Sequence, residues 1–333
     1  MQILLTGASG FIGGALAPTL LAEGHAVRGF SRDPDRARAA LAGAAVPNRA
    51  TTLAATTLDT GGTAEMEIVR GDVLTGEGLT RALKGVEVAY YLIHSMETRT
   101  ASDSSSHAFA ERERLAAETF ATHARHAGVR RVVYLGGLLP RSGPASRHLA
   151  SRAEVEEILR AHVPDAVALR AAIVIGARSR SFRLLVRLVE RMPVLTLPAW
   201  RRYRTRPIDV RDTVAMLAAA ARVEAVAART LDIGGPEALT YEALLRRLAE
   251  LLLLPRPTLG LGMTMTPLTA HLAAALAGEE PELVVPLMEG LAGDLLPREH
   301  HAAELLGVQL HSLDSAIECA LREWETVEPL AAR

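Results

Sequence analysis

A glycine-rich loop close to the N-terminus constrains the fold more than any other feature of this sequence. The apolar run "QILLT" leads into "GASGFIGG", in which Gly7, Gly10 and Gly13 have the spacing of a dinucleotide-binding loop. In such a loop one glycine permits a tight turn, one lets the backbone approach a pyrophosphate, and one lets the following helix pack on the strand. The N–H groups at that helix N-terminus favour bound phosphate. We therefore expect a dinucleotide to contact Gly7, Ser9, Gly10, Phe11, Ile12 and Gly13.

Apolar runs typical of strands alternate with helical patterns through the first two thirds of the chain. The expected strands cover residues 2–7, 25–31, 66–72, 86–95, 130–137, 165–176 and 229–235. The expected helices cover residues 12–23, 33–41, 76–84, 108–127, 150–162 and 211–222. This alternation predicts an α/β fold of Rossmann type, a doubly wound parallel sheet with right-handed crossovers.

The places where this alternation stops predict the domain organisation. We expect residues 1–179 to form the Rossmann domain, to which 205–235 return, and 180–204 with 236–333 to form a smaller, mainly helical C-terminal lobe over the substrate. In the lobe, Thr240 is expected to cap a helix, and no further strong strand signal follows it. Residues 43–64, rich in Ala, Thr and Gly and without a period, are interpreted as a surface insertion.

Composition excludes several classes of protein. The net charge is −1, so no overall field draws the chain to nucleic acid or to an anionic membrane. Cys319 is the single cysteine, which excludes an intramolecular disulfide and fits a reducing cytoplasm. The N-terminus has no pattern of an export signal. The apolar stretch 263–278 is interrupted by Pro267 and is shorter than the roughly 20 residues of a membrane span. We expect a cytoplasmic protein without a membrane span.

The end of the second strand indicates which dinucleotide is bound. An NAD site places an acidic residue there, to accept a hydrogen bond from the ribose 2′-hydroxyl. This chain has Ser31 followed by Arg32. A guanidinium suits a 2′-phosphate, which favours NADP(H) over NAD(H). The alternative is a solvated Arg32 with Asp33 on the ribose, but Asp33 is better placed to cap the next helix.

The ends of the third and fourth strands hold further candidates for cofactor contacts. Asp72 is placed to accept a hydrogen bond from the adenine amino group with Val73 against the ring, or to cap the helix that follows. Leu92, Ile93 and His94 lie at the carboxyl end of the fourth strand, where ligands bind in open α/β sheets.

Together, these motifs resemble the short-chain dehydrogenase/reductase superfamily in its extended or atypical branches. The landmarks are "TGASGFIGG" (6–14), "GDV" (71–73), "YYLIHSM" (90–96), "VVYLGG" (132–137), "HLASRAEVEEIL" (148–159), "LRAAIVIG" (169–176), "RPIDVRDTV" (206–214) and "DIGGPEALTYEAL" (232–244). Within the superfamily, the strand end "LIHSM" and the segment around "RPIDV" resemble a bacterial NAD(P)-binding group. That group is related to NmrA-like regulators and to the NAD(P)H-binding accessory subunit of respiratory complex I.

The resemblance implies a catalytic Ser, Tyr and Lys, and this chain differs at all three places. The serine would fall within Leu135–Gly137, the tyrosine on His148 and the lysine on Arg152. The resemblance also implies that Gly136, Arg152 and Ile173 contact the cofactor.

The two exchanged positions leave a chemically usable pair. His148 and Arg152 are four residues apart, so both lie on one helix face. An imidazole with an ordinary pKa near ~6.5 can donate a proton at physiological pH, whereas a guanidinium cannot. We expect His148 to act as the proton donor, with a rate that falls as pH rises through its pKa. His94 is a second candidate. The alternative for both histidines is a structural hydrogen bond.

A basic run, "PAWRRYRTRP" at 198–207, has three alternative interpretations. In the first, Arg204 or Arg206 contacts cofactor phosphates or an acidic substrate. In the second, the run is a solvated loop. In the third, it binds single-stranded nucleic acid. We expect no nucleic-acid partner. No pattern of metal ligands is present, so no metal is expected.

Three functions fit these features. The first is an NADP(H)-dependent oxidoreductase with a non-standard proton donor, acting on a small, partly hydrophobic carbonyl or quinone. The second is a dinucleotide sensor or regulator with a protein partner, and the third is a structural subunit that keeps a bound cofactor. The cleft histidines favour the first, and the altered catalytic positions favour the other two.

Overall fold

The structure is a computed structural model that describes residues 1–42, 66–93, 106–141, 143–260, 262, 291 and 293–330. It divides into two compact units. The first unit comprises Met1–Leu135, Val155–Ala168 and Val214–Arg229, and the second comprises Gly136–Glu154, Leu169–Thr213 and Thr230–Arg333. The expected insertion at 43–64 lies outside the described residues, and the domain boundaries given above remain a prediction.

A seven-stranded sheet has the order β11-β6-β5-β4-β1-β2-β3. Its strands are β1 (Gln2–Thr6), β2 (Ala26–Ser31), β3 (Glu67–Arg70), β4 (Val88–Tyr91), β5 (Arg131–Gly137), β6 (Val167–Ala171) and β11 (Thr230–Ile233). The pairs β1–β2, β2–β3, β1–β4 and β4–β5 are parallel, so their carboxyl ends meet at one edge. Each expected strand is present, and the predicted doubly wound Rossmann-type fold is confirmed.

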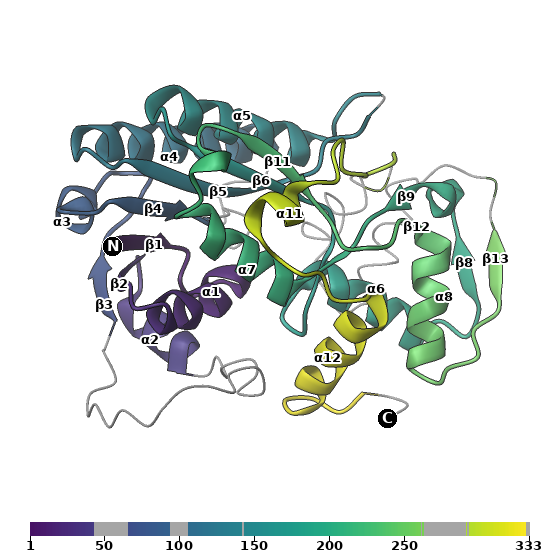
Figure 1. Ribbon diagram of the computed structural model, residues 1–333. Helices are drawn as coiled ribbons and strands as arrows, with labels where there is room; N and C mark the ends of the chain where they lie inside the picture. Colours follow the sequence, from purple (N-terminus) through teal and green to yellow (C-terminus); the bar gives the residue numbers. More distant parts are fainter. Residues whose placement is uncertain are drawn as a thin grey trace. The chain divides into compact units, whose positions relative to one another are not determined.

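Helices cover both faces of this sheet. They are α1 (Phe11–Ala22), α2 (Pro34–Ala42), α3 (Leu79–Leu83), α4 (Ser106–His126), α5 (Arg147–His162) and α7 (Val210–Ala220). Figure 1 shows α3, α4 and α5 on one side of the strands and α1 and α7 on the other. Strand β4 explains why, because its side chains alternate between the faces. Tyr91 packs 4.9 Å from the ring of Phe120 on α4, whereas the hydroxyl of Tyr90 donates to the carbonyl of Leu217 on α7.

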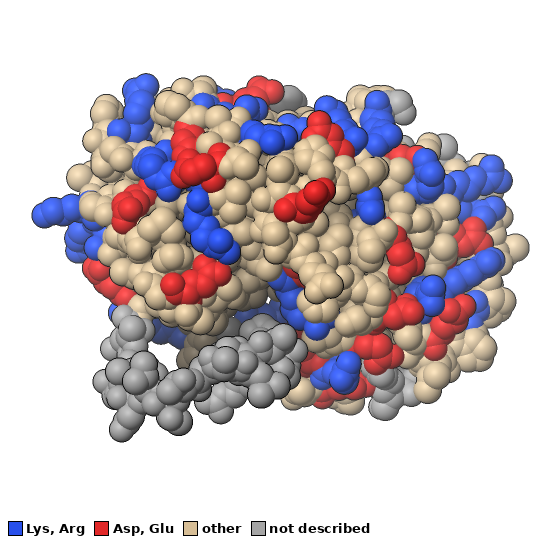
Figure 2. All heavy atoms as spheres, in the orientation of Figure 1, with Lys and Arg blue, Asp and Glu red and all other residues tan. Residues whose placement is uncertain are grey.

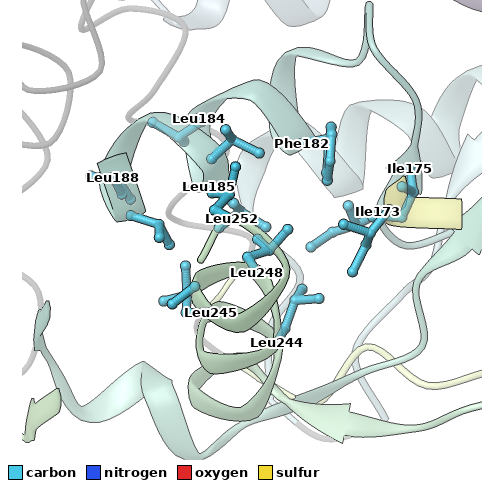
Figure 3. Packing of buried hydrophobic residues seen from close by; sticks show 14 of the residues in the cluster. Ile173, Ile175, Phe182, Leu184, Leu185, Leu188, Leu244, Leu245, Leu248 and Leu252 are labelled. Carbon is cyan, nitrogen blue, oxygen red and sulfur yellow. The ribbon is translucent and has the colours of Figure 1, made fainter. Parts of the chain in front are cut away.

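The second unit has its own apolar core. Its further elements are β7 (Val174–Ile175), α6 (Arg180–Arg191), β8 (Leu195–Leu197), η3 (Ala199–Arg202), β9 (Arg204–Thr205), β10 (Ile208–Asp209), β12 (Leu239–Thr240), α8 (Tyr241–Leu251), β13 (Thr258–Gly260), α11 (Ala302–Leu306) and α12 (Leu313–Glu325). Figure 3 shows leucines of α6 and α8 facing one another in this core. The apolar positions of α8 recur at helical spacing, at Leu244, Leu245, Leu248 and Leu252, so one face of the helix is buried.

The C-terminal region is mainly helical among the described residues, as predicted. Thr240 caps α8 as expected, because its hydroxyl accepts a hydrogen bond from the Ala243 amide at 3.1 Å. Strand β13, for which the sequence carries no strong signal, pairs in parallel with β8. Strand β13 has three residues. A strand this short is not long enough to show the alternation by which strands are recognised in sequence.

Candidate functional site

The three loop glycines occupy three different environments. Gly7 has φ +69°, and a Cβ there would lie 2.5 Å from the Leu92 carbonyl oxygen, so the turn requires glycine. A Cβ on Gly13 would collide with the backbone of Gly7, because α1 packs directly on the loop. A Cβ on Gly10 would approach one atom, the Gly7 oxygen, at 3.1 Å. The space in front of Gly10 is therefore left for a ligand, as the pyrophosphate interpretation requires.

Thr6, which the sequence analysis did not single out, fixes this loop to the sheet. Its buried hydroxyl donates to the Tyr90 carbonyl at 2.8 Å and accepts from the Leu92 amide at 3.1 Å. The hydroxyl thereby joins the end of β1 to the end of β4. A polar residue at the end of an otherwise apolar strand is a signal that could have identified it, because a buried hydroxyl needs partners.

The N-terminus of α1 is arranged to receive an anion. Gly10 is its capping residue and offers no side chain to the first turn. The first intrahelical hydrogen bond runs from the Gly14 amide to the Gly10 carbonyl at 2.9 Å. The amides of Phe11, Ile12 and Gly13 precede it and carry the positive end of the helix dipole. These N–H groups would hold the phosphates of a dinucleotide.

At the end of β2, Arg32 lies on the surface and Asp33 caps the helix that follows. The Asp33 carboxylate accepts a hydrogen bond from the Arg36 amide at 3.0 Å, which confirms it as the cap of α2. The Ser31 hydroxyl donates to the Asp33 carbonyl at 2.9 Å and so shapes the same turn. The Arg32 side chain is exposed at the carboxyl edge of the sheet.

At the end of β3, Asp72 organises a turn. Its carboxylate accepts from the Leu74 amide at 2.8 Å, and its carbonyl accepts from the Gly76 amide at 2.9 Å. The alternative that Asp72 caps the following helix is wrong, because Gly78 is the N-cap of α3, and an adenine contact stays a prediction. Val73 is buried in the core between the sheet and α3, together with the partly buried Ile93 at the end of β4.

The other candidate residues of the site belong to the second unit, apart from His94, which lies outside the described residues. Gly136 ends β5 together with Gly137. Ile173 is buried in the core of the second unit, and its carbonyl accepts from the Ile208 amide at 2.9 Å.

His148 and Arg152 lie one turn apart near the start of α5. Burial, and then the neighbouring positive charge of Arg152, lowers the pKa of His148 from 6.5 to about 4. The expectation of an imidazole that is charged in part at physiological pH is therefore wrong, because the sequence shows neither the burial nor the repulsion. His148 is neutral near pH 7 and carries one N–H donor.

Leu149 lies against the end of β5, where the resemblance would place a serine. A Cβ on Gly137 would lie 2.6 Å from the Leu149 Cδ2 atom, so the leucine side chain fills the space beside this glycine. Leu149 also packs with the buried Leu138 and Leu295. Sequence reasoning missed this apolar contact because the two residues meet only in the fold.

The arginines of the basic run are engaged within the second unit. Arg204 pairs with Asp294 at 3.3 Å. Arg206 donates to the Gly235 carbonyl at 2.5 Å and contacts the Nδ1 atom of His300 at 2.6 Å. These contacts favour neither binding of the cofactor or an acidic substrate nor binding of nucleic acid by this run.

Two further features are absent from the residues that the structure describes. No group of three or more metal-ligating side chains occurs among them. No helix within these described ranges has the length and apolar character to cross a membrane.

Comparison with known proteins places this geometry in context. Residues 3–234 match the model of the NAD dependent epimerase/dehydratase family. Ceramide reductase from Caulobacter vibrioides is 28% identical over 188 residues, which are 56% of this chain and 57% of that protein. The matched segment thus spans little more than half of this curated relative.

Two solved structures with the same fold cover nearly the whole chain. UDP-glucuronic acid 4-epimerase from Bacillus cereus in complex with NAD has a TM-score of 0.67 at 16% identity, over 98% of this chain and 97% of that one. A short-chain dehydrogenase/reductase superfamily protein from Agrobacterium tumefaciens with bound NAD has a TM-score of 0.64 at 18% identity, over 98% and 96%. At these identities the likeness establishes the fold.

Proposed function

Because the chain belongs to the NAD dependent epimerase/dehydratase family, within the short-chain dehydrogenase/reductase superfamily, we propose that it is an NADP(H)-dependent reductase. Its substrate is a carbonyl or quinone on a partly hydrophobic molecule. The phosphate loop carries the proposal, because Gly7 and Gly13 are closed by backbone while Gly10 leaves room for a ligand. The nicotinamide cofactor supplies the hydride when bound.

Arg32 supports the choice of NADP(H). It is exposed at the end of β2, where no carboxylate is available for a ribose 2′-hydroxyl, since Asp33 caps α2. A guanidinium there would hold a 2′-phosphate through charge-assisted hydrogen bonds. The two solved structures described above contain NAD, so NAD(H) is the competing choice.

His148 would act as a neutral donor. With a pKa of about 4 the ring is uncharged at physiological pH, so its N–H group would hydrogen-bond the substrate oxygen and stabilise the negative charge that develops there, while the proton that completes the alcohol would come from solvent. Arg152 would hold the nicotinamide ribose, and its positive charge adds to burial in disfavouring a charged His148.

The substrate would be apolar next to the group that reacts. Leu149 on α5 lies against Gly137 at the end of β5 and packs with Leu138 and Leu295. The relative named ceramide reductase supports a lipid carrying a reducible group over a nucleotide sugar. His94 remains a candidate for a second substrate contact.

A dinucleotide sensor is the second candidate. The observation that favours it is the filled space at Gly137, since no serine-like donor can be accommodated there without moving Leu149. In that case the cofactor would bind and no substrate would oxidise it.

The test measures binding and chemistry separately. NADPH and NADH are titrated by fluorescence into the wild type, Arg32→Asp, and the control Arg125→Asp, an exposed arginine on α4. We expect the wild type and Arg125→Asp to bind NADPH more tightly than NADH. In Arg32→Asp the affinity for NADPH should fall about tenfold or more. Equal affinities in the wild type would refute the NADP(H) assignment. NADPH oxidation is then followed with long-chain ketones, quinones and aromatic ketones; if none is reduced, the sensor function holds.

A further inference from the structure

We draw no further inference here: the strongest candidate, the cluster of Arg201, Arg246 and Arg256 around β13 in the second unit, carries nothing because Glu242 pairs with the first two arginines, backbone carbonyls accept hydrogen bonds from the third, and acidic and basic side chains are mixed on the surface shown in Figure 2, so that nothing in the structure shows what would bind there.

Discussion

The phosphate loop and the start of α5 carry the two halves of the family pattern, and they differ in how far they keep it. In the loop, Gly7, Gly10 and Gly13 each have the environment that dinucleotide binding requires. On α5 the expected tyrosine and lysine are His148 and Arg152. The loop is a matter of backbone shape, since a Cβ on Gly7 or Gly13 would collide with backbone, whereas a Cβ on Gly10 would approach a single atom. The α5 pair is a matter of proton affinity, which several side chains can provide at different pKa values.

This difference indicates that binding and chemistry change independently in this chain. Loop residues are constrained by their own backbone, since a Cβ on Gly13 would collide with Gly7 whatever the substrate is. The α5 residues are constrained by the reaction and, at Arg152, by the contact with the nicotinamide ribose proposed above. A chain can therefore keep its cofactor while its reaction changes, and the experiments below separate the two properties.

The largest effect is expected from His148→Phe, which keeps the size of the ring and removes both nitrogens. If the N–H group of the neutral ring stabilises the negative charge that develops on the substrate oxygen, turnover of a responsive carbonyl should fall by about 10²–10³, the range for losing one such donor. NADPH affinity should stay unchanged. Because the pKa is about 4, the wild-type rate should show no fall from this residue as pH rises from 5 to 8. A fall centred near the ordinary histidine pKa of 6.5 would contradict the neutral donor.

Gly10→Val should come next and act on the other half of the pattern. Its Cβ approaches a single atom of the chain, so the variant should fold, while the branched side chain fills the space of the pyrophosphate. We expect NADPH affinity to fall at least about 100-fold, measured by fluorescence titration. Gly13→Val is the comparison, because there the collision is with backbone and thermal stability should fall as well. Wild-type affinity in Gly10→Val would mean that the loop is only a turn.

The smallest effect concerns stability against pH. His148 takes up a proton below pH 6.5 when unfolded, but only below about 4 when folded. Between these values the unfolded chain binds more protons, so stability is complete above pH 6.5 and falls as pH falls toward 4. The loss from this residue is at most about 3 kcal/mol. Urea unfolding at several pH values should show this loss of stability in the wild type. His148→Phe should lack the part of the loss that comes from the histidine. Equal pH dependence in both would mean that the ring is not buried.

The fold could be predicted well because the patterns that indicate it depend on residues close together in the sequence. The glycine spacing, the Asp33 cap and the apolar strands each act within a few residues, and each is present in the structure. Contacts distant in sequence escaped prediction. The bond from Leu92 to Thr6 and the approach of Leu149 to Gly137 depend on which elements pack together.

Electrostatics escaped prediction for the same reason. The lowered pKa of His148 comes first from burial, which no sequence pattern reports, and only then from Arg152 four residues away. The proposed relation to NmrA-like regulators and to the complex I subunit also remains a prediction, since the matching family model is broader than either.

The hydroxyl of Thr6 has a consequence for how quickly a cofactor is taken up. Because it bonds to Tyr90 in β4 and to Leu92 directly after that strand, the start of the loop is held in place by contacts within the chain. A ligand that meets a preorganised loop loses its own freedom of motion but does not have to order the protein. Association at this end of the molecule should therefore be limited by diffusional encounter, and differences in affinity between dinucleotides should appear in how long each one stays bound.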